Sequence, residues 1–380
     1  MKFVVSSGEL MQHLQTVAKI ISTKSVSVVP VLGNILFELE GNQLKLSAAD
    51  LSSRITSTLE VSNEGGAGSF TVPERIILES IKELPDQPVS LEVSPESLEA
   101  TLTYSNGHYN FVATSSDTYP QAISLEGSTH SLSLSARALQ TGLERTIIAA
   151  SSDERRPIMT GVNFDFLEDK LVLVASDGRI LVKYTDHNVN PGFTASFCMP
   201  GKISQLLSRS LLPKENADIT LSYDDKYVCI QMERFTLTAK LLDGRFPNYN
   251  SVIPSSSPYA VVVDRESLLY AAKRVSIFSN KASNLILLEV GEEQIRITAN
   301  DLDFSVAAEE SIPCQCLPAD ARIRIGFDFN MLQQLLSGLS SEQITLDLAD
   351  QTRAGVITPS ETEEGIEICS LIIPLKLVGE

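Results

Sequence analysis

The chain has 380 residues, of which 43% are hydrophobic, and its formal net charge is −18. This acidic balance argues against a conventional DNA-binding protein, which normally carries an excess of lysine and arginine. No apolar run approaches the roughly 20 residues that a membrane-spanning helix needs, and Lys2 precedes too short an apolar run for a secretory signal. We therefore expect a cytoplasmic protein without a membrane partner.

The expected elements recur in three rounds along the chain, each running strand, helix, hairpin, strand, helix and further strands. Helical periodicity marks residues 7–21, 73–84, 135–150, 200–214, 264–281 and 328–339. Hairpins with period-two alternation are expected at 35–50, 162–177 and 285–300. These hairpins end in Asp50, Asp177 and Asn300, which we interpret as turn residues that satisfy backbone N–H groups.

Three prolines set the period of the repeat. Pro120, Pro247 and Pro374 each follow a large apolar residue, and they stand at equal spacing in the sequence. The spacing predicts three domains, at 1–127, 128–254 and 255–380. A chain built almost wholly of repeats is typical of a surface or scaffold rather than of an enzyme.

The charge is unevenly distributed along the chain. The six helical segments carry twelve basic and eight acidic residues, whereas the rest of the chain is strongly acidic. If these helices shared one face of an assembly, that face would be mildly positive within an acidic body. Ordinary solvated helix surface explains the same charge pattern.

Catalytic and metal-binding patterns are missing from the sequence. The five cysteines are expected to be reduced and mostly buried, and Cys314 and Cys316 have no histidine cluster beside them for a zinc site. The four histidines are scattered, and His13 is expected at the surface of its helix. Because no phosphate-binding loop, dinucleotide fingerprint or zinc-protease motif is present, we expect no cofactor and no metal.

A series of short motifs resembles the bacterial DNA polymerase III beta subunit family, the sliding clamps, over the whole length of the chain. The order and spacing of the motifs carry the resemblance more than any single one. They are MKF at 1–3, VLGN at 31–34, AADL at 48–51, TVP at 71–73, VASDG at 174–178, MPGK at 199–202, KLLDGRFPNY at 240–249, VIP at 252–254, IGF at 325–327 and IPLKL at 373–377.

The resemblance implies an α+β fold of three repeated clamp domains, each with two helices packed on antiparallel sheets. Two chains would join head to tail into a six-domain ring whose helices line the hole. Such a homodimer would encircle double-stranded DNA without sequence preference and tether its partners through short linear motifs. The implied partners are the replicative polymerase alpha subunit, the clamp-loader complex, and repair and translesion polymerases.

The resemblance also implies three sets of site residues. DNA contacts would come from Lys24, Arg155, Arg156, Lys202, Arg209, Lys273 and Arg274. The dimer interface would join His108, Tyr109 and Phe111 to Ile277, Phe278 and Glu309. A hydrophobic cleft for partner peptides would be lined by Met159, Gly178, Arg179, Leu181, Pro247, Val252, Met331, Leu371, Ile372, Ile373, Pro374, Leu375 and Leu377.

The C-terminal run LIIPLKL supports the cleft independently. A paired strand is expected here, with Pro374 ending the pairing and turning Leu375 and Leu377 onto the surface beside Pro247. The alternative is that this run only completes the core of the third domain.

The sequence departs from the family at three places. Arg179 and Ile180 stand where the family often has His-Arg, so a change in the polar rim of the cleft is expected. Met331 stands where a Tyr is known, and the chain continues with 378–380 beyond the usual end. The alternative functions are a non-clamp cytosolic scaffold and an unrecognised enzyme built from three repeated domains, and the lack of a metal-binding carboxylate cluster within one domain argues against the enzyme. A structural adhesin of repeated β domains is a further interpretation, against which the helix pair in every repeat argues.

Overall fold

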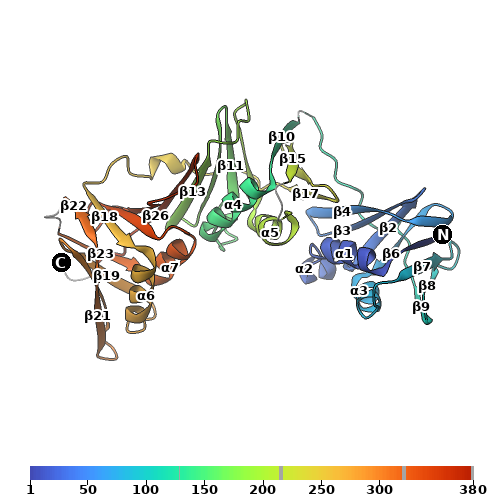
Figure 1. Cartoon of the computed structure of the whole chain (residues 1–380), viewed down its shortest axis with the longest axis horizontal. Helices are drawn as coiled ribbons and strands as arrows, with labels where there is room; N and C mark the ends of the chain where they lie inside the picture. The colour runs from blue at the N-terminus through green and yellow to red at the C-terminus, as the bar shows by residue number, and fades with distance from the viewer. Residues whose placement is uncertain (128, 214–216, 319–321, 378–380) are drawn as a thin grey trace. The chain divides into compact units, whose positions relative to one another are not determined.

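The computed structural model describes residues 1–127, 129–213, 217–318 and 322–377. They form two compact units, unit 1 with Met1–Arg137 and Ser210–Leu241, and unit 2 with Ala138–Arg209 and Leu242–Glu380. Lys214, the last residue of the expected helix at 200–214, and residues 378–380 beyond the family's usual end lie outside the described residues. Each unit is built from antiparallel sheets with helices packed on them (Figure 1).

Unit 1 contains a five-stranded sheet in the order β5-β1-β7-β8-β9 and an eight-stranded sheet in the order β10-β15-β16-β17-β4-β3-β2-β6. Its helices are α1 (Ser7–Ala18), α2 (Thr23–Val28), η1 (Pro30–Gly33) and α3 (Glu74–Lys82). Its strands are β1 (Lys2–Ser6), β2 (Asn34–Glu40), β3 (Gln43–Ala49), β4 (Ser53–Glu60), β5 (Ser62–Gly65), β6 (Gly68–Pro73), β7 (Pro88–Val93), β8 (Glu99–Tyr104), β9 (Gly107–Val112), β10 (His130–Ser135), β15 (Asp218–Tyr223), β16 (Tyr227–Gln231) and β17 (Phe235–Lys240).

Unit 2 contains a nine-stranded sheet in the order β14-β11-β12-β13-β26-β25-β24-β18-β22 and a four-stranded sheet in the order β21-β20-β19-β23. Its helical segments are α4 (Ala136–Thr146), η2 (Ile147–Ala149), η3 (Pro157–Thr160), α5 (Gly201–Leu206), the π-helical turn η4 (Leu207–Leu211), η5 (Tyr249–Ser251), α6 (Arg265–Ser276) and α7 (Phe329–Ser337). Its strands are β11 (Gly161–Leu167), β12 (Lys170–Ser176), β13 (Ile180–Asp186), β14 (Ala195–Pro200), β18 (Tyr259–Asp264), β19 (Leu285–Val290), β20 (Gln294–Asp301), β21 (Val306–Pro313), β22 (Gln315–Leu317), β23 (Ile323–Asp328), β24 (Gln343–Leu348), β25 (Gly355–Pro359) and β26 (Ile366–Ile372).

The helices begin where local chemistry favours it. Side-chain oxygens of Ser6, Asp264 and Asp328 accept hydrogen bonds from backbone N–H groups in the first turns of α1, α6 and α7. Pro73 and Pro200 stand at the starts of α3 and α5, where the missing N–H is not needed. All six expected helices are present, and α2 is an additional one that the sequence did not predict.

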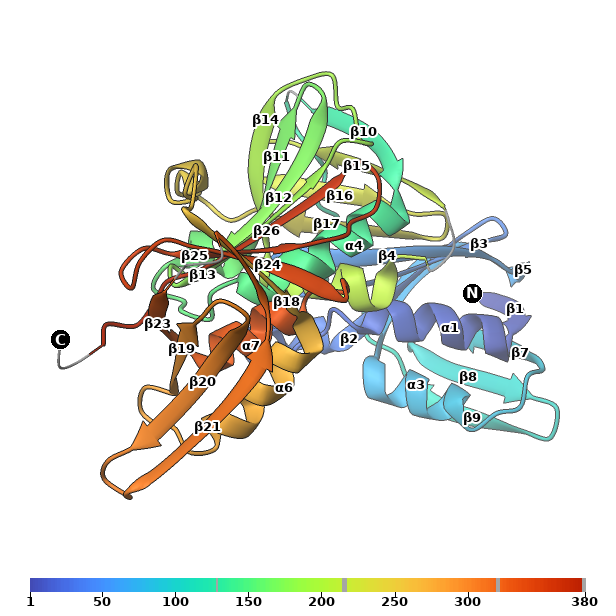
Figure 2. The ribbon, with the colours of Figure 1, turned by 60° about the vertical axis from the view of Figure 1, so that its left-hand side comes forward.

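Apolar stripes on these helices close the cores. Leu10, Leu14 and Val17 of α1 are fully buried, and α1 packs against α3 in unit 1. In unit 2, α6 packs against α7 beside the β19–β23 strands (Figure 2). His13 is also buried in α1, contrary to the expected surface position, because its ring lies on Phe235 and its Nδ1 bonds the Ser57 hydroxyl.

The middle repeat is divided between two sheets. Its strands β10, β15, β16 and β17 join the first repeat through the β4·β17 pair. Its strands β11, β12, β13 and β14 join the third repeat through the β13·β26 pair. The same scheme leaves β9 and β21, the counterparts of β17 and β13, at the edges of their sheets. The domain limits at 127 and 254 stay a prediction.

The three expected hairpins are present, and the third is shifted by one residue. Asp50 and Asp177 each accept backbone N–H bonds from the turn that follows, as expected. In the third hairpin this role belongs to Asp301, whose carboxylate accepts the N–H of Asp303, and not to Asn300.

Candidate peptide-binding site

The floor of the candidate site is the outward face of the β13·β26 pair in unit 2. Leu181 stands directly opposite Leu371 in this antiparallel pair. Both side chains are buried in a cluster with Val172, Val174 and Tyr249. The Tyr249 hydroxyl donates a 2.6 Å hydrogen bond to the Asp165 carboxylate, so its polar end is satisfied. The result is a rigid apolar base.

The C-terminal segment forms one wall and changes sheets as it does so. The Ile373 N–H donates to the Arg179 carbonyl at 2.9 Å, which continues the pairing with β13. Pro374 has no N–H to donate, and the next N–H, that of Leu375, bonds the Gly326 carbonyl of β23 at 2.8 Å. The predicted end of pairing at Pro374 is therefore confirmed.

Leu375 and Leu377 are half-buried, which corrects the expectation that they stand out on the surface. Leu377 approaches Gly326 so closely that a Cβ there would lie 2.8 Å from its Cδ2 atom. The absence of a side chain at Gly326 thus lets the segment lie flat on β23. Ile373 is the exposed apolar side chain of this wall.

The turn between β12 and β13 forms the opposite wall. Gly178 has a φ of +91°, a conformation that a side chain would strain. The Arg156 guanidinium donates to the Asp177 carbonyl at 2.9 Å and contacts the Met159 sulfur at 3.5 Å. The structure therefore places Arg156, which was predicted as a DNA contact, beside the cleft residues Gly178 and Met159.

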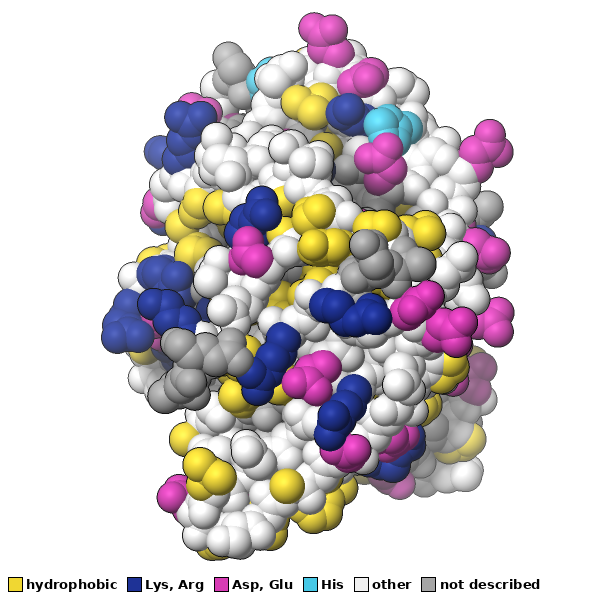
Figure 3. All heavy atoms as spheres, turned by 90° about the vertical axis from the view of Figure 1, so that its left-hand side faces the viewer, with side chains coloured by type: hydrophobic (Ala, Val, Ile, Leu, Met, Phe, Trp, Pro, Cys, Tyr) yellow, Lys and Arg dark blue, Asp and Glu magenta, His cyan; other side chains and the backbone are white. Residues whose placement is uncertain are grey.

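Polar and apolar groups alternate on the remaining rim. Arg179 is half-exposed and pairs with the Asp328 carboxylate at 3.4 Å. Val252 and Pro247 are exposed, and Met331 on α7 is half-buried. Ile180 and Ile372 are buried and stand opposite each other. Ile180 is buried, and the change in the polar rim expected from its replacement of a family Arg stays a prediction. Hydrophobic side chains gather among basic ones on the face shown in Figure 3.

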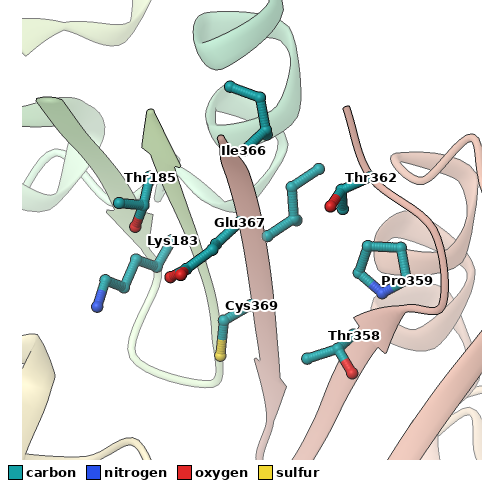
Figure 4. Close-up of a pocket in the computed structure, with 9 residues that line it drawn as sticks. Lys183, Thr185, Thr358, Pro359, Thr362, Ile366, Glu367 and Cys369 are labelled. Atoms are coloured by element: carbon teal, nitrogen blue, oxygen red, sulfur yellow. The ribbon is translucent and has the colours of Figure 1, made fainter. Parts of the chain in front are cut away.

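A second hollow of about 310 Å³ lies on the same strand pair. Lys183 and Thr185 of β13 line it beside their β26 neighbours Cys369 and Glu367, and Thr358, Pro359 and Thr362 complete the lining (Figure 4). Burial raises the pKa of the Cys369 thiol, which keeps the sulfur protonated and weakly nucleophilic. The hollow is lined by hydroxyl groups together with one lysine and one glutamate.

The basic residues predicted to contact DNA lie on both units. Lys24 is exposed on α2 of unit 1. In unit 2, Lys202 and Arg209 are exposed on α5 and the turn after it, and Lys273 and Arg274 on α6. Several of the predicted contacts are already in ion pairs, Arg155 with Asp153 at 2.9 Å, Arg156 with the same carboxylate at 3.7 Å, and Arg274 with Glu310 at 2.5 Å.

The residues predicted for the dimer interface lie on the two edge strands and beside them. His108, Tyr109 and Phe111 belong to β9. Glu309 belongs to β21 and pairs with Arg296, and Ile277 and Phe278 follow α6 and are exposed. Both sets of predicted interface residues therefore lie on or beside an edge strand whose outer side has no neighbouring strand in the described sheets.

Among the described residues, no group of three or more His, Cys, Asp or Glu side chains is placed to hold a metal ion. None of the five cysteines, each within the described chain, forms a disulfide, and two of them are buried and three half-buried. The described helices include none that is long and apolar enough to cross a membrane.

Sequence reasoning did not predict that Gly326 lies beside Leu377 and Arg156 beside Met159, two residues predicted for the cleft. Gly326 lies in the IGF motif at 325–327, whose glycine was a usable signal. The position of Arg156 has no local signal, because it depends on how η3 packs against the turn after β12.

Comparison with known proteins agrees with this architecture. The models of the N-terminal, central and C-terminal domains of the DNA polymerase III beta subunit match residues 1–124, 133–248 and 250–374. The beta sliding clamp of Synechococcus elongatus is 29% identical over 384 residues, covering 99% of this chain and 100% of the relative. That of Pseudomonas aeruginosa is 25% identical, with 99% and 100% covered.

Solved structures show the same fold. The crystal structure of the DNA polymerase III beta subunit from Pseudomonas aeruginosa has a TM-score of 0.93 at 24% identity, covering 99% of this chain and 100% of that one. The sliding clamp from Bacillus subtilis has a TM-score of 0.91 at 23% identity, with 99% of each chain covered. A Pseudomonas aeruginosa clamp bound to griselimycin has a TM-score of 0.91 at 25% identity, covering 99% of this chain and 100% of that one.

Three repeats that share sheets across their junctions and the match to known clamp domains define a sliding clamp of DNA replication. The chain belongs to the DNA polymerase III beta subunit family. The predicted family, fold class and general function are thereby confirmed.

Proposed function

We propose that two copies of this chain join head to tail through β9 of one and β21 of the other, and that the closed ring encircles duplex DNA and tethers partners through the cleft. One observation carries the proposal. The free edges β9 and β21 are the counterparts of β17 and β13, which are paired at the two junctions inside the chain. Two unlike complementary ends favour a heterologous contact that closes on itself.

The internal junctions supply a register for the junction between copies. At the first junction Ser53, the first residue of β4, stands opposite Ala239, and at the second Ile180 stands opposite Ile372. The counterpart of Ser53 and Ile180 is Val306, the first residue of β21. Ala239 and Ile372 correspond to Phe111, since each pairs with the matching residue of the neighbouring strand.

This register makes definite pairs across the interface. Val306 would stand opposite the partner's Phe111, and Ala308 opposite the partner's Tyr109. Glu309 would stand opposite the partner's His108, so an acid would meet an imidazole on adjacent strands. The outward backbone groups of β21 from Val306 to Glu310 would then gain partners on β9.

Helix contacts support the same assembly. In unit 2 the end of α4 packs against α7, because Arg145 donates to the Gly338 carbonyl and Gln334 donates to the Ile148 carbonyl. Arg274 and Ile277 occupy the positions of Arg145 and Ile148 in the next repeat. Ile277 and Phe278 would therefore pack on the partner's α3, the counterpart of α7, where Ile76 is exposed.

The dimer can be tested by one substitution with a matched control. Replacing Phe278 by Asp should give monomers in sedimentation and light scattering, because a charge would be buried in the apolar contact. Val252→Asp, an exposed apolar position in the cleft, should keep the dimer. A Phe278→Asp protein that stays dimeric would remove this region from the interface.

DNA binding would be topological and sequence-independent. Phosphates would be contacted by exchangeable basic side chains, which keeps the attraction salt-dependent and weak enough for sliding. The proposed contacts are Lys24, Arg155, Arg156, Lys202, Arg209, Lys273 and Arg274. Loaded rings should stay on a circular plasmid and be lost once it is cut. Equal retention on both forms would contradict encirclement.

The cleft would capture short peptides from the polymerase alpha subunit, the clamp loader, and repair and translesion polymerases. A buried leucine floor with exposed Ile373 and Val252 beside it suits one or two Leu or Phe anchors, and Arg179 suits a polar side chain such as Gln. Deleting residues 375–380 should abolish binding of such a peptide in a fluorescence titration and leave the dimer intact. Unchanged affinity would place the partner site elsewhere.

The role proposed here is a non-catalytic one in the cytoplasm. The support is membership of a family of processivity factors and a site whose groups suit binding. Purified chain should therefore show no nucleotide incorporation of its own, and should increase the length of product that a polymerase makes per binding event.

A further inference from the structure

The loop between β20 and β21 differs from its two counterparts. Asp50 and Asp177 are separated from the next strand by two residues, whereas four residues, 302–305, separate Asp301 from Val306. The two longest apolar side chains of this loop are Leu302 and Phe304. They are 83% and 78% exposed, more than any other large apolar side chain of the described chain.

The loop has a defined conformation that presents these side chains. The Asp301 carboxylate accepts the Asp303 N–H at 3.0 Å, and the Leu302 carbonyl accepts the Ser305 N–H at 3.3 Å. Ser305 has a φ of +52°, an uncommon conformation for a residue with a side chain. Local hydrogen bonds thus hold the loop together without burying Leu302 or Phe304.

The internal junctions indicate which residue of the facing strand such a loop contacts. The Ser52 carbonyl accepts the Lys240 N–H at 2.8 Å, and the Arg179 carbonyl accepts the Ile373 N–H at 2.9 Å. Lys240 and Ile373 are the residues that follow Ala239 and Ile372. In the proposed register the matching donor across the interface is the N–H of the partner's Val112, and the matching acceptor is the carbonyl of Ser305.

The receiving surface is apolar at this point. Val112 is 64% exposed at the end of the edge strand β9. Beyond it the chain leaves this edge, because Thr114 pairs with Thr71 in the eight-stranded sheet. The two extra loop residues therefore have no strand to pair with, and they would contact the partner through side chains.

We propose that Leu302 and Phe304 form an apolar latch that covers the partner's Val112 at the end of the β9·β21 pair. The partner that this exposed loop contacts is a second copy of the chain. The proposal rests on the head-to-tail dimer proposed above. The latch adds buried apolar area next to the strand pairing, which slows dissociation of the two copies. The counterpart turns at 51–52 and 178–179 are two residues shorter.

The test compares dimer dissociation in matched variants of the full chain. The double variant Leu302→Ser and Phe304→Ser should raise the dimer dissociation constant at least tenfold, measured by sedimentation and by subunit exchange between fluorescently labelled copies. Leu51→Ser, at the exposed apolar residue of the counterpart loop, should leave the constant unchanged. Melting temperature and circular dichroism check that the loop variant is folded.

A substitution at Val112 tests whether this residue is the one that the loop contacts. Val112→Ser alone should weaken the dimer, and adding it to the loop variant should have little further effect, since coupled residues are not additive. An unchanged dissociation constant in the loop variant would overturn the latch while leaving the dimer in place. A wild-type chain that is monomeric at all concentrations would instead refute the dimer, so the two failures are distinguishable.

Discussion

The two internal junctions, β4·β17 in unit 1 and β13·β26 in unit 2, share one backbone plan and differ in a few side chains. Leu181 of the second junction corresponds to Arg54 of the first, since both lie one residue into their strand and stand opposite Leu371 and Thr238. Arg54 is only 6% exposed and donates to the Pro120 carbonyl at 2.9 Å. Its guanidinium lies 5.6 Å from the centre of the Tyr119 ring.

These contacts close the first junction from within. Burial raises the pKa of Tyr119 to about 12, so the ring beside the cation stays neutral. At the second junction the corresponding Leu181 leaves an apolar floor, and Ile373 and Val252 remain exposed beside it. One repeated backbone therefore carries a buried cation at the first junction and, at the second, an apolar floor that we propose as the base of the binding cleft.

The largest expected effect comes from giving the second junction the arginine that the first junction has at the corresponding position. Leu181→Arg would bury a cation whose carbonyl partner belongs to the other junction. We expect a loss of about 3 kcal/mol in the free energy of unfolding and at least a hundredfold weaker peptide binding. Urea denaturation and fluorescence titration measure the two effects. Leu181→Met, which keeps the volume, should cost less than about 1.5 kcal/mol, and binding retained by the arginine variant would contradict the assigned floor.

A displaced C-terminal segment should affect the cleft alone. A Cβ at Gly326 would lie 2.7 Å from Leu285 Cδ1 and 2.8 Å from Leu377 Cδ2, so Gly326→Val forces the segment away from β23. We expect about tenfold weaker peptide binding, or roughly 1.4 kcal/mol, by titration. Gly291→Ala, where the nearest atom is a carbonyl oxygen at 3.4 Å, serves as the control. Equal affinities would show that the segment does not shape the cleft.

The reverse exchange should have a smaller effect. Arg54→Leu removes the donor to the Pro120 carbonyl, which we expect to lower the free energy of unfolding by about 1–3 kcal/mol. No peptide binding should appear at this junction, because the buried Tyr119 still occupies it. Chemical denaturation and a titration on a variant that also carries Val252→Asp measure both outcomes. Binding gained in unit 1 would show that one residue is enough to open a cleft.

The smallest effect is a pH dependence expected of the first junction. Burial lowers the pKa of His13 below its usual 6.5, with Glu9 opposing and Arg234 reinforcing the shift. The unfolded chain then binds a proton more readily than the folded chain, so stability falls as the pH drops below about 6.5, by at most about 1.4 kcal/mol per pH unit. Urea denaturation of wild type and of His13→Asn between pH 5 and 7.5 should give a flatter dependence for the variant. Parallel curves would exclude His13 as the cause.

Local patterns predicted most of the elements. Period-two and period-3.6 alternation depends on which side chains face the core, and it located the six helices and the three hairpins. The shift from Asn300 to Asp301 was not predicted. The register of a hairpin depends on cross-strand pairing, and the spacing of apolar residues does not determine that register to within one residue. The burial of His13 was not predicted for a related reason, since it depends on elements that are distant in sequence.

The resemblance to the family predicted which residues of the candidate site lie together, although Leu181 and Leu371 lie outside its short motifs. The structure brings these two residues into one cluster, and their role in binding stays a prediction. The half-burial of Leu375 and Leu377 depends on Gly326, a contact between two strands that no local pattern encodes. The sharing of the middle repeat between two sheets was likewise invisible, because pairing between repeats follows from tertiary packing.

That sharing has a consequence for recombination between relatives. A gene segment that carries the middle repeat alone would transfer four strands of one sheet and four of another, and each group would have to fit foreign neighbours at the β4·β17 and β13·β26 pairs. Chimeras that exchange whole sheets should therefore fold more often than chimeras that exchange whole repeats. In this chain the unit that can be exchanged without new strand pairing is the sheet, although the sequence repeats domain by domain.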